Sequence, residues 1–250
     1  RQPYWRHYKL FADAVSRLCF ALARGVHQCD VAVLFPAMTA QAAAKMGEPI
    51  RRNDESSECF LELIGAMHWS RPSVGVLDRD RRDFEVLNDE VLERAEVREG
   101  RLHTGGEAYR ALILPACRVV SERSARVIEE FARAGGIVVA VGRVPGVVKG
   151  AGGCTASDAL ARLVAEGKAK FVASASEVPK ALEELPRNVD APVPTLHRRL
   201  GEWNLLFVPA AFPKATQIEG GVLRDWWKAN YSFDPGRYQR NMRVRIAGEA

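Results

Sequence analysis

The sequence predicts an α/β fold, in which an open parallel sheet is flanked by helices and followed by a β-rich segment. Two wholly apolar runs carry the prediction, Ala111–Pro115 and 137–142, and an amphipathic run joins them. Strands buried on both faces read as continuous apolar runs, and a parallel pair needs a long crossover between its strands. The stretch 109–142 is therefore expected to be the centre of the fold.

The joining run has the signals of a helix at both ends. Ser121 is a favourable N-cap, and Gly135 suits the left-handed residue that ends many helices. Between them, Ala125, Ile128 and Phe131 recur at helical spacing, so one stripe can lie on the sheet.

Upstream, a helix is predicted from Tyr8 to a stop near Gly25, with an apolar stripe that is expected to pack on a core. For the aromatic residues at its start, Trp5 and Tyr8 among them, core packing is favoured over anchoring to a neighbouring domain. Further strands are expected at 30–36, 74–77, Phe84–Leu87 and 169–172, a hairpin at 97–109, and helices at 55–68, 90–95, 155–166 and 177–185, the last capped by Ser176.

A domain boundary is expected after residue 186, because Pro186, Pro192 and Pro194 interrupt the chain there. Residues 1–186 would form the α/β domain. Residues 187–250 carry short alternating strands at Leu196–Leu200, 203–208 and 242–246 and read as the start of a β-sandwich.

Composition excludes several classes. The net charge is +5, with 36 basic residues scattered among 31 acidic ones, which does not make the basic stripe of a nucleic-acid-binding protein. No apolar run reaches transmembrane length, so no membrane partner is expected. The 5 cysteines show no paired spacing, which favours a reducing compartment and buried thiols at Cys19 and Cys117, without assigning a location. The first residue is Arg1, so we expect a piece of a longer polypeptide.

Ligands of open α/β sheets bind outside the carboxyl ends of the strands, here residues 36 onward, 115–120 and 142–153. The glycines at 150–153 favour a flexible loop over a phosphate cradle, since neither dinucleotide nor Walker motifs are complete. Likewise, the charge run 78–83 favours a solvated loop over a cation site. No nucleophile elbow, no histidine ligand spacing and no cofactor motif is found, so catalytic, metal and cofactor sites are not predicted.

A set of sequence stretches resembles one enzyme family. They are residues 4–8 with the helix to Gly25, the strand at 30–36, Asp83-Phe84, 92–102, 105–110 before the leucine-proline strand, and His197-Arg198-Arg199. Together they resemble the region after the catalytic barrel in bacterial α-L-rhamnosidase-type glycoside hydrolases. That region is similar to a degenerate class I glutamine amidotransferase-like domain of flavodoxin-like fold, and the likeness spans nearly the whole chain.

The resemblance implies a non-catalytic accessory portion of a large glycoside hydrolase that acts on plant polysaccharides. Its partners would be the barrel of the same polypeptide, a second copy of the chain, and the carbohydrate substrate. The amidotransferase cysteine would fall near Gly142-Arg143 and is missing. His197, Arg198 and Arg199 would face the barrel or the sugar, or else form a surface salt-bridged strand. Two alternatives remain: a flavodoxin-like module that binds a nucleotide or another small molecule at 142–153, and an amidotransferase or peptidase that uses Cys117.

Overall fold

The structure is a computed structural model that describes residues 3–44, 55–66, 73–209, 216–219, 230–233, 236, 238 and 241–247. Its centre is a five-stranded, fully parallel sheet in the order β14 (Lys170–Val172), β11 (Ile137–Val141), β9 (Ala111–Pro115), β2 (Val31–Leu34) and β5 (Phe84–Leu87). The predicted parallel pair of β9 and β11 is confirmed, with Ile137 opposite Ala111 and Val141 opposite Pro115.

Helix α6 (Glu122–Arg133) connects these two strands and begins and ends where the sequence predicts. The Ser121 hydroxyl accepts a hydrogen bond from the Ser124 amide at 2.9 Å, which satisfies one of the unpaired amides at the helix start. At the other end Gly135 has φ of 94°, a conformation that glycine adopts without steric cost.

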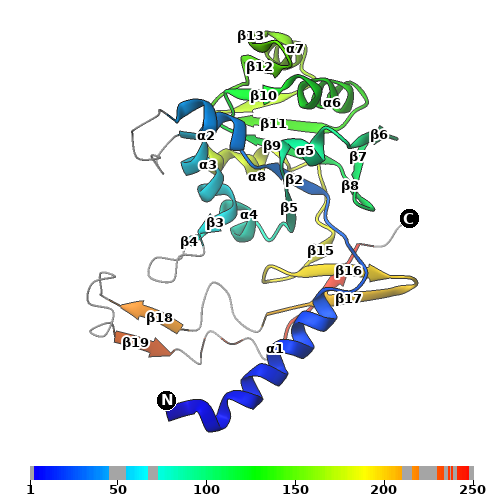
Figure 1. Ribbon diagram of the computed structural model, residues 1–250. Helices are drawn as coiled ribbons and strands as arrows, with labels where there is room; N and C mark the ends of the chain where they lie inside the picture. The colour runs from blue at the N-terminus through cyan, green and yellow to red at the C-terminus, as the bar shows by residue number, and fades with distance from the viewer. Residues whose placement is uncertain are drawn as a thin grey trace.

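Helices cover both faces of the sheet (Figure 1). On one face lie α6, α5 (Asp89–Leu92) and α7 (Ala159–Ala165), which bury Ile128, Phe131 and Leu163 against the β9 residues Leu112 and Leu114. On the other face lie α3 (Glu55–Ile64), α4 (Val76–Arg79) and α8 (Val178–Ala181), together with Leu63, Leu77, Val178 and Leu182. The central strands are therefore apolar at every position because both of their faces are core.

Small sheets surround this body. The predicted hairpin at 97–109 is a meander of β6 (Glu96–Arg98), β7 (Arg101–Thr104) and β8 (Glu107–Tyr109). β10 (Val119–Ser121) pairs with β12 (Val147–Gly150), and β12 with β13 (Gly153–Ala156). β1 (Val26–His27) pairs with β16 (Leu196–Leu200), which forms a hairpin with β17 (Trp203–Phe207). The two-stranded pairs are β3 (Gly65–Ala66) with β4 (Ser73–Val74), β15 (Val189–Asp190) with β20 (Arg245–Ile246), and β18 (Thr216–Glu219) with β19 (Asn230–Phe233).

The amino-terminal helix forms as predicted, but its packing was predicted wrongly. After a 3-10 turn, Pro3–His7, helix α1 (Tyr8–Leu22) extends away from the body (Figure 1), and none of its residues is buried. Its apolar stripe is exposed: Phe11 by 63%, Val15 by 40% and Leu18 by 41%. Trp5 stacks on Tyr8 with ring centroids 5.3 Å apart, yet this pair also lies on the surface, outside any core of the described residues.

Other local predictions need correction. Of the expected strand at 74–77, Val74 belongs to β4, whereas Val76 and Leu77 begin helix α4. The helix at 155–166 starts later because 153–156 belong to β13. Ser174 with Glu177, and not Ser176, forms the capping box before α8. Cys19 is exposed, whereas Cys117 is buried as expected. The predicted helix at 55–68 ends at Ile64, and its last two positions lie outside the described residues. Helix α2 (Ala37–Ala43) occupies the loop after β2.

The charge run 78–83 is not a solvated loop. The Arg82 side chain is buried, and it donates from Nε to Asp80 at 2.8 Å and from Nη2 to the Leu182 carbonyl at 2.8 Å. Arg187 donates to the Asp80 carboxylate at 2.5 Å and to the Asp80 carbonyl at 2.7 Å. The charges thus join the amino edge of the sheet to the segment after residue 186. The predicted division at 186 stays a prediction, although β1 and β16 pair across it.

The packing of α6 on β11 generates the first prediction. A Cβ added at Gly136 would lie 2.1 Å from the fully buried Phe131 ring, so the ring must shift within the core. We expect Gly136→Ala to lower the free energy of unfolding by about 2 kcal/mol, the usual cost of overpacking a core. Urea unfolding measures it.

Gly152→Ala is the matched control, because nothing lies within 4 Å of a Cβ at Gly152. Its effect should stay within about 0.5 kcal/mol. Equal effects of the two substitutions would contradict the packing of α6 on β11.

Candidate functional site

The cavities that we describe lie at the amino ends of the parallel strands, opposite to the edge that the sequence argument favoured. Asp30 precedes β2, Asp83 precedes β5 and Arg110 precedes β9, and all three line one or both of the cavities. The β16–β17 hairpin closes this edge from the other side (Figure 1). The space between the sheet and the hairpin is therefore the candidate site.

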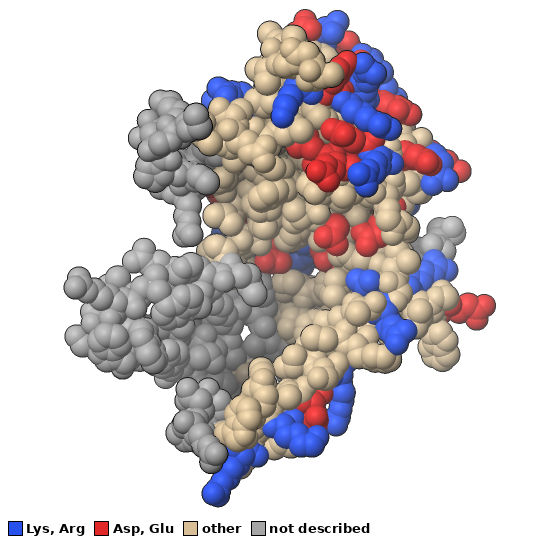
Figure 2. Space-filling model, viewed as in Figure 1, with Lys and Arg blue, Asp and Glu red and all other residues tan. Residues whose placement is uncertain are grey.

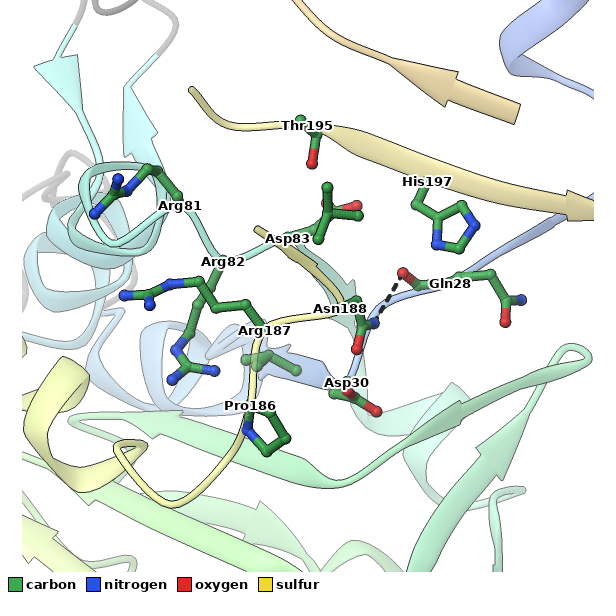
Figure 3. Close-up of a pocket in the computed structure, with 12 residues that line it drawn as sticks. Gln28, Asp30, Arg81, Arg82, Asp83, Pro186, Arg187, Asn188, Thr195 and His197 are labelled. Carbon is green, nitrogen blue, oxygen red and sulfur yellow. Dashed lines mark hydrogen bonds between the residues drawn. The ribbon is translucent and has the colours of Figure 1, made fainter. Parts of the chain in front are cut away.

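The inner cavity is too small for a sugar or a nucleotide. Its volume is about 20 Å³, which is the room that a single water molecule needs. In Figure 3, Thr195 and His197 point from the β16 segment toward the side that carries Asn188, while the Gln28 side chain points away from them. The Asn188 amide donates to the Gln28 carbonyl at 3.0 Å. This cavity therefore lies within a polar contact between two parts of the chain.

An outer cleft of about 800 Å³ continues from it and has room for a small-molecule ligand. Its walls are rich in hydrogen-bonding side chains from the sheet edge, the meander and the hairpin; they include His27, Arg101, Glu107, Arg110, Arg199 and Asn204. Such a surface suits a ligand with many hydroxyl or carboxylate groups better than an apolar ligand.

A histidine in the wall of the outer cleft contacts several acidic groups. His27 is 5% exposed. Its Nε2 lies 2.7 Å from Asp83 Oδ2, its Nδ1 lies 3.2 Å from Glu85 Oε2, and the Cys29 sulfur is 3.7 Å from Nδ1. Glu107 completes the group, since one oxygen each of Glu85 and Glu107 and one nitrogen of His27 lie within 4.8 Å of one another.

The acidic neighbours decide the charge of His27. Burial alone lowers the pKa of the imidazole, but the hydrogen bonds with Asp83, Cys29 and Glu85 outweigh it and raise the pKa to about 12. The same contact with His27 lowers the pKa of Glu85, although burial opposes it. His27 is therefore an imidazolium at neutral pH, and both of its nitrogens donate.

Cys29, His27 and Asp83 follow the order of a nucleophile, a base and an orienting carboxylate, but the pKa shifts of Cys29 and His27 do not suit such a triad. Burial raises the pKa of the Cys29 thiol to about 11, despite the hydrogen bond with His27. A protonated thiol is a poor nucleophile, and an imidazolium cannot take its proton. Tyr109 donates a hydrogen bond to the Glu107 carboxylate. The pKa of the Tyr109 phenol is raised mainly by burial and secondly by this hydrogen bond.

The residues predicted from the sequence lie on β16 with different surroundings. His197 is 7% exposed, and its Nε2 bonds to Asn204 at 2.9 Å, while its buried Nδ1 has no hydrogen-bond partner among the described residues. Arg198 lies opposite His27 in register and donates to the carbonyls of Arg24 and Gly25, each at 2.7 Å. Arg199 lines the outer cleft. The run thus contributes to the site, with His197 and Arg199 at the cleft and Arg198 holding β1.

At the carboxyl edge, the positions where chemistry was sought are occupied by other structure. Gly142 follows β11 with φ of 68°, the strained turn that a nucleophile elbow uses, yet it has no side chain. The Cys117 thiol is buried and contacts the Pro115 carbonyl at 3.6 Å. The glycines at 150–153 form the turn of the β12–β13 hairpin.

Comparisons with known proteins give a loose relationship. No family model and no curated protein matches the chain. Among solved structures it is similar to a rhamnosidase from Novosphingobium sp. PP1Y, with a TM-score of 0.43 and 15% identity over 73% of this chain and 17% of that one. It is also similar to a β-galactosidase from Bifidobacterium adolescentis, with a TM-score of 0.30 and 13% identity over 88% of this chain and 90% of that one. These structural neighbours are glycoside hydrolases. Separately, no helix among the described residues is long and apolar enough to span a membrane.

The burial of the thiols predicts their reactivity. Iodoacetamide should modify the exposed Cys19 and Cys154 in the native protein, and it should modify Cys29 and Cys117 only after unfolding. Cys59 should react slowly at pH 8, because burial and then the nearby Glu62 and Glu55 raise its pKa to about 12. Peptide mass spectrometry in native buffer and in urea measures all five. Rapid native labelling of Cys117 would instead support a nucleophilic role.

Proposed function

We propose that this chain is a non-catalytic accessory portion of a glycoside hydrolase of the α-L-rhamnosidase type, docked on the catalytic barrel of the same polypeptide. The enzyme class comes from the sequence resemblance alone. The similar solved structures add no weight at their low TM-scores. The accessory role is supported by one observation above all: the first helix of the chain presents an apolar face that its own body leaves uncovered.

That apolar face is larger than the single exposed apolar residues that are common on protein surfaces. Beside the stripe of Phe11, Val15 and Leu18, the neighbouring hairpin exposes Trp203 by 76%. Figure 2 shows α1 with an uncharged tan band along its length and with charged side chains along its lower edge. Burying one large apolar side chain contributes about 1.5–3 kcal/mol. A helix that keeps this face in water therefore lacks the stabilisation that packing of an apolar face gives to most protein helices. A covering partner explains why the sequence keeps the stripe.

The absence of catalysis in this portion is supported by the carboxyl edge of the sheet. The turn at Gly142 has a positive φ, as a nucleophile elbow does, but glycine has no side chain that could act as a nucleophile. We also propose that the sheet is flavodoxin-like: numbered along the chain, its strands lie in the order 2-1-3-4-5 that this fold uses. We propose that His197 and Arg199 contact the sugar from the wall of the outer cleft, and that Arg198 keeps β1 in register.

Two measurements test the proposal. The isolated chain should not hydrolyse aryl α-L-rhamnosides, whereas the whole enzyme should. Sustained turnover by the isolated chain would reject the accessory role.

The docking surface is tested in the whole protein with the double substitution Phe11→Asp and Leu18→Asp. Because no α1 residue is buried, the free energy of unfolding of the α/β body should change by less than about 0.5 kcal/mol. Limited proteolysis should then cut between barrel and chain at least ten times faster. Lys9→Ala with Asp13→Ala, an ion pair on the same helix, is the control.

If the double variant loses only self-association in sedimentation experiments, the face binds a second copy of the chain and the barrel contact is wrong. If neither proteolysis nor association changes, α1 is not a docking surface.

A further inference from the structure

We propose that His27, Glu85 and Glu107 bind a divalent transition-metal cation of the zinc class beside the outer cleft. One ligand atom of each residue lies within 4.8 Å of the other two. The inference does not depend on the accessory role, because it uses only side chains of this chain.

The spacing fits coordination. Ligand atoms about 2.1 Å from a tetrahedral metal ion lie about 3.4 Å from one another. His27 Nδ1 and Glu85 Oε2 are 3.2 Å apart, so a small rotation of either side chain brings both to a shared ion. The ligands come from β1, β5 and β8, which are far apart in the sequence, so the ion would hold these strands together.

The second shell has the arrangement that metal sites use. The other nitrogen of His27 contacts Asp83 at 2.7 Å, which is the carboxylate–histidine pair that fixes the ring and directs the lone pair of Nδ1 at the metal. Glu107 in turn accepts a hydrogen bond from the buried Tyr109. His27 and Glu107 are thus each oriented by a residue that is not itself a ligand.

Charge favours the cation as well. Asp83, Glu85 and Glu107 surround one imidazole, and the charge of Arg198 acts on Glu85, while Arg101, Arg110 and Arg199 also line the outer cleft. Three carboxylates gathered at one position attract a doubly charged cation. Binding replaces the proton on Nδ1 by the metal and releases that proton to solvent, while the proton on Nε2 stays with Asp83.

The donor set points to zinc-class ions. Imidazole nitrogen suits zinc and its neighbours in the first transition row, whereas magnesium and calcium prefer all-oxygen sites. His27 and Glu107 also line the outer cleft, so a coordination position left free by three protein ligands faces it. A hydroxyl or carboxylate of a ligand in the cleft would reach the ion there.

The test is metal binding by the full chain after removal of metals with EDTA. Titration calorimetry should give one Zn²⁺ per chain, with Mg²⁺ at least 100-fold weaker. A Zn²⁺ concentration about 100 times Kd should raise Tm by about 5–10 °C. His27→Gln and Glu107→Gln should each weaken binding at least 100-fold, and Asp83→Asn about 10–100-fold.

Glu96→Gln is the control, since Glu96 is an exposed glutamate on β6 of the same meander and lies outside the cluster. It should bind Zn²⁺ as the unchanged protein does. Zn²⁺ X-ray absorption on the unchanged protein covers the case that a variant fails to fold, and the expected shell is one imidazole nitrogen with oxygens.

Failure of the EDTA-treated protein to bind Zn²⁺ would overturn the proposal. So would unchanged affinity in folded His27→Gln or Glu107→Gln protein, or a shell that contains sulfur or lacks imidazole.

Discussion

The burial of β9 and β11 between two layers of helices is the constraint on which the rest of the structure depends. Leu112 and Leu114 face α6, and Ala111 and Ile113 face the opposite layer. Because neither face can tolerate an unpaired backbone group, the strands must pair along their whole length, and the crossover must cover one face. This fixes where every strand begins and therefore where the amino edge of the sheet lies.

The chemistry of the chain gathers at that edge and not at the carboxyl ends. There, strands enter the sheet from polar turns, so charged side chains can stay partly hydrated while their backbone is already held. Asp83 lies just before β5, Glu107 begins β8, and His27 ends β1. At the carboxyl edge, helix α2 fills the space instead: the Thr39 hydroxyl accepts from the amides of Arg118 and Val119 at 3.0 and 3.1 Å.

The body and helix α1 pose different energetic problems. The body meets its own packing needs, with Phe131, Ile128 and Leu163 fully enclosed. Helix α1 and Trp203 of the hairpin keep apolar area exposed, from 40% of Val15 to 76% of Trp203. A metal ion across β1, β5 and β8 would stiffen the base from which α1 projects, because α1 leads into β1 within a few residues. The two proposals thus concern neighbouring parts of the chain but rest on separate observations.

The sequence by itself determined the parallel pair, helix α6 with its Ser121 and Gly135 ends, and the α/β class, because these follow from local periodicity and capping. One sequence signal of the cluster is the presence of polar residues two positions apart, whose side chains share one side of an extended chain. These pairs are His27/Cys29, Asp83/Glu85 and Glu107/Tyr109. Only the tertiary structure decided that these pairs meet, that the run at 78–83 is partly buried, and that α1 is uncovered. Pairing of strands across the chain, as between His27 and Arg198, is a long-range event that no local pattern encodes.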